Sequence, residues 1–136
     1  MTGYRLRPVQ EQRERDEQSV RGELADAVGD ARAAEARLAG ATERVAALHE
    51  ALRHGFPTTT IAELARVEHY RARLRGQLEQ ALLDELRARE ACAGRTASVE
   101  LARERLALAR AARRVVEAHF ARWRDEQRKL AERREE

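Results

Sequence analysis

Apolar residues recur every seven positions through two long stretches of this chain, and this repeat limits the folds open to it. An average apolar spacing of 3.5 residues forms a seam along one side of a helix, and that seam must be buried against another helix. In the first stretch the two columns of the repeat are Leu24, Ala31, Leu38, Val45 and Leu52, and Val20, Ala27, Ala34, Ala41 and Leu48. The sequence therefore predicts a coiled coil.

A second stretch carries its own pair of columns. The first column holds Val67, Leu74, Ala81, Ala88, Ala102, Ala109, Val116, Trp123 and Leu130, and Arg95 interrupts it. The other holds Leu64, Leu78, Cys92, Val99, Leu106 and Phe120, with Arg71, Glu85 and Arg113 as interruptions. In the first stretch, the same register before Val20 reads Gln10, Arg13 and Glu17, so we expect the first third of that helix to be weakly held.

The two prolines mark where the helices begin and end. Proline lacks a backbone N–H and clashes inside a helix, but it is tolerated in a first turn, where Pro8 lies. Pro57 lies in a turn signal in which Gly55 is expected to end the first helix in the left-handed conformation. Thr60 followed by Glu63 matches a capping box that starts the next helix.

These boundaries predict an all-α fold, a single antiparallel coiled-coil hairpin over residues 1–136. Its helices are expected at about 8–54 and 60–134, joined by a turn at 55–59. Pairing backward from Pro57 places Leu6 near Leu108, so the longer second helix would overhang by about 25 residues. The overhang would leave one group of apolar side chains without an intramolecular partner, namely Val115, Val116, Phe120, Trp123 and Leu130. Such a stripe marks an interaction surface, either for another protein or for a second copy, unless the chain bends to cover it.

Composition argues against an enzyme. The chain is 38% charged and 4% aromatic, which is typical of long helices and leaves little to build a pocket. No phosphate-binding glycine loop is present, Cys92 is expected on the seam, and His49, His54 and His69 match no metal motif. We therefore expect no catalytic residue, no cofactor and no metal.

Charge and hydropathy limit the partners. The net charge is +3, with acidic residues in excess over 9–54 and basic residues in excess over 110–136. Because acidic residues interrupt the arginines throughout, nucleic-acid binding is not expected. No signal peptide and no membrane-spanning run is visible, so we expect a cytoplasmic protein.

Three segments resemble the FliJ/YscO family of flagellar export and type III secretion proteins. The opening Tyr4-Arg5-Leu6-Arg7-Pro8 followed by a charged helix is similar to the start of that family. The charged tail over 116–129 is similar to its C-terminal helix, and the helix after the turn, with Tyr70 and Leu74, also resembles it.

The resemblance implies a central stalk at the cytoplasmic base of the secretion apparatus. The helix ends would enter the hexameric export ATPase, with Phe120, Arg122, Trp123 and Arg124 in contact with it. The turn end would reach the cytoplasmic domain of the export gate through Ile61, Leu64, Tyr70 and Leu74, although Leu64 and Leu74 also fit the hairpin seam. Secretion chaperones are possible further partners, and membrane association would be peripheral, through partners only. The alternatives are a self-associating coiled-coil scaffold or a chaperone escort without a role in the ATPase ring.

Overall fold

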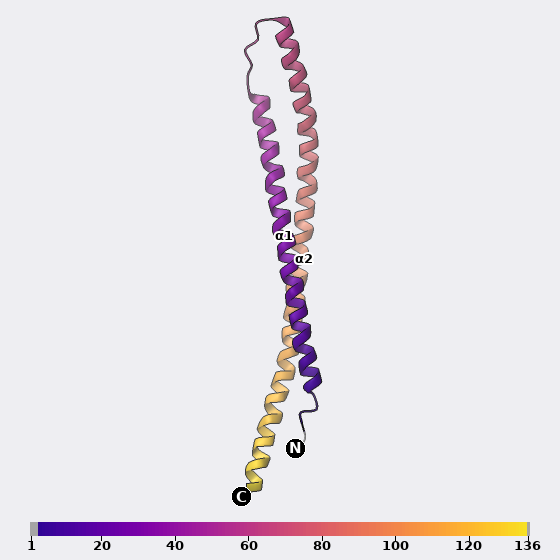
Figure 1. Ribbon diagram of the computed structural model, residues 1–136, viewed down its shortest axis with the longest axis vertical. Coiled ribbons are helices and arrows are strands. Elements are labelled where there is room, and N and C mark those ends of the chain that lie inside the picture. The colour runs from indigo at the N-terminus through magenta and orange to yellow at the C-terminus, as the bar shows by residue number, and fades with distance from the viewer. Residues whose placement is uncertain (1–2, 136) are drawn as a thin grey trace. The chain divides into compact units, whose positions relative to one another are not determined.

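The computed structural model describes residues 3–135 and contains two long helices packed against each other, α1 (Arg7–Arg53) and the longer α2 (Ile61–Glu135) (Figure 1). Both helices begin and end within one residue of the positions predicted from the prolines and the capping signal. The expected all-α antiparallel hairpin is therefore confirmed.

The chain divides into two compact units, each holding a section of α1 beside a section of α2. One, here called the terminal unit, comprises Met1–Val28 and Ser98–Glu136, and the other, here called the turn unit, comprises Gly29–Ala97.

The core of the turn unit is built from the predicted seams. Val45 and Leu48 of α1 are buried against Leu74 and Ala81 of α2, with Ala51, Leu52 and Leu78 packed around them. Ala81 is the most buried member of this small cluster, at 2% exposed, and its methyl side chain lets the two helices approach closely.

In the terminal unit the buried apolar side chains come from α2. Val99, Ala102 and Leu106 are buried, and Val20 and Leu24 of α1 are half-buried. Large apolar side chains are few on this part of α1, so apolar burial here is unequal between the two helices. A charged residue, Glu17, completes the buried side of α1.

The connection between the helices, residues 54–60, is not the tight reversal expected. No glycine of residues 3–135 has a positive φ, so the prediction of a left-handed conformation at Gly55 is wrong. The start of α2 is capped as predicted, because the Glu63 N–H donates to Thr60 Oγ1 at 3.1 Å. In return, Glu63 Oε2 accepts from the N–H and the hydroxyl of Thr59, at 2.9 and 3.1 Å.

This connection runs beside the first turns of α2 and sets the pairing of the helices. Arg71 Nη2 donates to the carbonyl oxygen of His54 at 3.4 Å, and the rings of Phe56 and Tyr70 are 5.8 Å apart. Hence α1 ends opposite Arg71, well into α2, rather than opposite its first residue. The pairing of Leu6 with Leu108 assumed an immediate reversal at Pro57 and is therefore wrong.

Candidate interaction sites

Three aromatic rings gather where the two ends of the chain meet in the terminal unit. The Tyr4 ring lies 5.0 Å from the Phe120 ring and 5.2 Å from the Trp123 ring, and those two rings are 5.8 Å apart. Tyr4 Oη also lies 2.9 Å from His119 Nδ1. We call these four residues the aromatic cluster. The expectation that Phe120 and Trp123 lack an intramolecular partner is wrong, because the register of the helices brings Tyr4 to them.

A shallow groove continues from the aromatic cluster toward the end of α2. It is lined by Gly3, Trp123, Arg124, Gln127, Leu130, Ala131 and Arg134. The Arg124 guanidinium carbon lies 5.9 Å from the centre of the Phe120 ring, and Leu130 is 46% exposed. Arg122 is exposed but does not line the groove. The groove therefore combines apolar and cationic side chains and has no acidic residue in its lining, a composition suited to an acidic partner with an apolar side chain.

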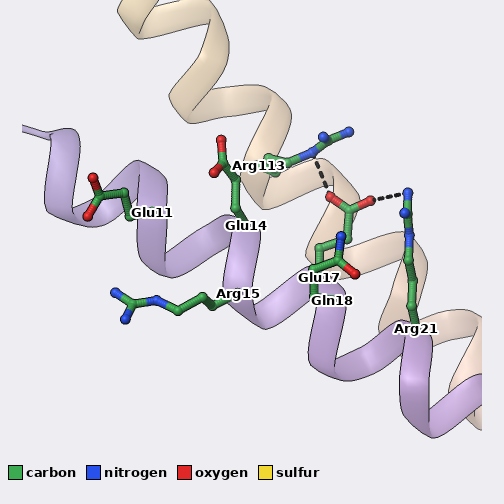
Figure 2. A pocket seen from close by; sticks show the side chains of 7 residues that line it. All are labelled: Glu11, Glu14, Arg15, Glu17, Gln18, Arg21 and Arg113. Atoms are coloured by element: carbon green, nitrogen blue, oxygen red, sulfur yellow. Dashed lines mark hydrogen bonds and ion pairs between the residues drawn. The ribbon is translucent and has the colours of Figure 1, made fainter.

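The second cluster of the terminal unit surrounds Glu17, whose carboxylate is only 3% exposed (Figure 2). Its Oε2 lies 2.6 Å from Arg113 Nε on α2, and its Oε1 accepts from Arg21 Nη2 at 3.0 Å and lies 3.6 Å from Arg110 Nε. The Nε–H bond of Arg113 is not directed at Glu17 Oε2, so this pair is an ionic contact rather than a hydrogen bond. Three guanidinium groups thus compensate one buried carboxylate.

Sequence reasoning missed this pairing. Glu17 and Arg113 each appear in the sequence as a break in an apolar seam, and the first third of α1 is expected to be weakly held. The available signal was that the two breaks carry opposite charges and come from helices that must face each other. Without the correct register they could not be matched.

At the turn end, the side chains expected to meet an export gate fall into two groups. Ile61 is 88% exposed and Leu64 is 50% exposed, because α1 ends before it reaches them. Tyr70 is 37% exposed and packs edge-on against Phe56. Leu74 is 6% exposed and belongs to the core of the turn unit, so the surface role expected for it is not open to it while the hairpin is closed.

The structure adds little that points to chemistry. Within residues 3–135, no group of three or more His, Cys, Asp or Glu side chains is placed to hold a metal ion. Cys92 is half-buried, as expected for the seam. Hydrogen bonds from the Thr59 backbone and hydroxyl lower the pKa of Glu63 below its ordinary value of 4.5, which is a capping effect. None of the described helices has a segment apolar and long enough to cross a bilayer.

Comparison with known proteins returned no match. No protein-family model matches the chain, and neither a curated protein nor a solved structure matches it significantly.

Proposed function

We propose that this chain is a non-enzymatic central stalk of a type III protein export apparatus. In this role it binds the hexameric export ATPase with the terminal unit and links it to the export gate, promoting ATP hydrolysis and substrate export. It would act in the cytoplasm, at the base of the apparatus.

One observation carries the proposal. The two segments that resemble the FliJ/YscO family, the opening around Tyr4 and the tail over 116–129, come together in the aromatic cluster. Arg124 lies over the Phe120 ring, with its guanidinium carbon 5.9 Å from the ring centre, and Arg122 is exposed on the same turn of α2. An aromatic group bordered by arginines is the usual composition of a binding hot spot. We therefore assign ATPase binding to Phe120, Arg122, Trp123 and Arg124.

The contact with the export gate is assigned to the exposed side chains at the turn end. Ile61 and Leu64 are the most accessible, and Tyr70 presents one edge beside Phe56. Leu74 is left out of this surface because it is buried. Exposed apolar side chains at one end of an otherwise charged protein mark a surface for a partner.

The test is ATP hydrolysis by the cognate export ATPase, with and without this protein. We expect stimulation by the wild type and loss of stimulation in the Phe120→Ala/Trp123→Ala double variant. Because both rings contact Tyr4, this double variant also disturbs the fold of the terminal unit. Arg122→Glu is the cleaner variant, since Arg122 is exposed and forms no ion pair within residues 3–135.

A matched control is Arg75→Glu, which reverses a charge at an exposed position of α2 in the turn unit. Arg122→Glu should abolish stimulation while Arg75→Glu retains it, with equal helicity by circular dichroism. No stimulation by the wild-type chain would refute the stalk proposal. It would favour a self-associating scaffold or an escort for secretion chaperones.

A further inference from the structure

A second apolar stripe follows α2 on the side turned away from the seam. Leu101, Leu108 and Val115 are seven residues apart and are 59%, 72% and 69% exposed. Ala111 and Ala118 follow Leu108 and Val115 by three residues, so they lie on the same side of the helix and are also exposed. The five residues form the outer stripe, which lies wholly within the terminal unit.

The spacing of the outer stripe indicates the shape of its partner. Apolar residues that alternate three and four apart present a straight row to a neighbouring helix, as the seam of the hairpin does. Within residues 3–135 no segment of α1 covers this side of α2, since its side chains stay exposed. A single exposed leucine needs no explanation, whereas a heptad row of them on a highly charged chain does.

Size and charge along the outer stripe are complementary to the same stripe running in the opposite direction. The larger side chains Leu101 and Leu108 lie in its first half, and the small Ala111 and Ala118 lie in its second half. In an antiparallel pair of α2 helices, Leu108 of one copy faces Ala111 of the other, and Leu101 faces Ala118. Large side chains opposite small ones allow close packing.

The same alignment pairs opposite charges. It places Glu104, which lies within the outer stripe, opposite Val115 of the second copy and beside the neighbouring Arg114, which borders the stripe. Both charged residues are exposed, and neither forms an ion pair within the described part of the chain. A two-fold axis repeats each contact, so every Leu–Ala and Glu–Arg pairing occurs twice. A parallel pair would instead place equal side chains and equal charges side by side.

We infer that the outer stripe is a self-association surface, through which α2 of one copy pairs antiparallel with α2 of a second copy. This inference goes beyond the stalk proposal, because none of the five residues of the outer stripe is assigned to the ATPase. Arg122, which is assigned to it, follows Val115 by seven residues on the same side of α2. The dimer is centred between Leu108 and Ala111 and leaves the hairpin of each copy intact.

The first test measures the mass of the full chain by sedimentation equilibrium. The wild type should form a dimer. Leu108→Gln should weaken dimerisation by about tenfold or more, since each dimer loses two buried leucines. The matched control is Leu86→Gln, which changes a 52% exposed leucine of α2 in the turn unit and should leave the dimer unchanged. A monomeric wild type, or a dimer that tolerates Leu108→Gln, would overturn the inference.

Charge exchange provides a second readout. Glu104→Arg and Arg114→Glu should each weaken the dimer, and the double variant should restore it because every Glu–Arg contact is then reversed. Failure of the double variant to recover, with helicity unchanged, would refute the proposed pairing.

Cross-linking tests the direction of pairing, in a Cys92→Ser background. Chains carrying Leu101→Cys should form a disulfide with chains carrying Ala118→Cys, and neither should do so readily with its own kind. Self-linking of each variant would indicate a parallel dimer and would contradict the antiparallel pairing.

Discussion

Glu17 of α1 lies 2.6 Å from Arg113 of α2 while only 3% of its side chain is exposed to solvent. A carboxylate this buried is tolerated only with charged partners, and Arg21 and Arg110 supply two more. Each of the two residues interrupts the apolar seam of its own helix, and the two interruptions lie opposite each other. They therefore form a polar contact that favours one register of the two helices over others.

Removing this charge should destabilise the terminal unit. Glu17→Gln loses the ionic contact and leaves three arginines close together, for an expected loss of about 1–3 kcal/mol in the free energy of unfolding. The measurement is urea unfolding followed by circular dichroism. Glu14→Gln, an exposed change one turn away, is the control and should have little effect.

The double replacement Glu17→Leu/Arg113→Leu tests whether this ionic contact is needed for stability or mainly favours one register of the helices. Buried ion pairs are often matched or exceeded by apolar side chains, so the double variant should recover the loss of Glu17→Gln. The single variant Arg113→Leu should be less stable than the double one, because it leaves Glu17 with fewer cations. A double variant no more stable than either single change would contradict this account.

The contacts of Tyr4 predict a fluorescence change. Tyr4→Ala removes three ring contacts, with His119, Phe120 and Trp123, and should cost about 1–2 kcal/mol. It should also shift the emission of Trp123, the single tryptophan, toward the red by admitting water. Tyr4→Phe keeps the ring contacts and loses only the contact of the hydroxyl with His119 Nδ1, so it should retain the wild-type emission. Equal spectra for wild type and Tyr4→Ala would show that Tyr4 does not cover Trp123 in solution.

Capping of α2 should depend on pH through Glu63. Its pKa is lower in the folded chain because the Thr59 N–H and hydroxyl donate to the ionised carboxylate. The resulting stabilisation is fully present above the unfolded value, ordinarily 4.5, and is lost as the pH falls through the lowered folded pKa. A carboxyl titration by NMR should give a Glu63 pKa below its ordinary value of 4.5. Glu63→Gln should remove this part of the pH dependence of helicity.

Alanine substitutions of glycines inside the helices should stabilise the protein. A Cβ atom added at Gly40 or Gly76 meets nothing within 4 Å, so close packing does not require either glycine. Each glycine costs about 1 kcal/mol relative to alanine inside a helix. Gly40→Ala and Gly76→Ala should therefore each raise the free energy of unfolding by about that amount, measured by urea unfolding. A loss of stability would indicate a conformation in which these glycines are needed.

The helices and their buried faces could be predicted from the sequence because they depend on local signals. Pro8, Pro57 and the Thr60–Glu63 cap give the boundaries, and the seven-residue repeat gives buried positions such as Val45 and Leu74. The pairing of the helices could not be predicted this way. The repeat is unchanged when one helix slides by seven residues, so the register depends on the path of residues 54–60.

The candidate sites, like the fold, could be predicted only in part. Aromatic residues are rare in this chain, so the sequence already indicates a distinctive cluster near Phe120 and Trp123. The register of the two helices determines the rest. It brings Tyr4 against the Phe120 and Trp123 rings, and it buries Leu74 while leaving Ile61 exposed. The outer stripe was not predicted from the sequence, and it was recognised only because Leu101, Leu108 and Val115 are exposed in the structure.

The path of residues 54–60 also restricts how a chain of this kind can change length during evolution. Losing seven residues from α1 alone would keep its apolar columns in line but move Glu17 about two turns along α2, away from Arg113. Tyr4 would move away from Phe120 by the same amount. Losing seven residues from both helices at the same level preserves both contacts. Relatives that differ in length should therefore differ by paired heptads, one on each helix, while the connection keeps its seven residues.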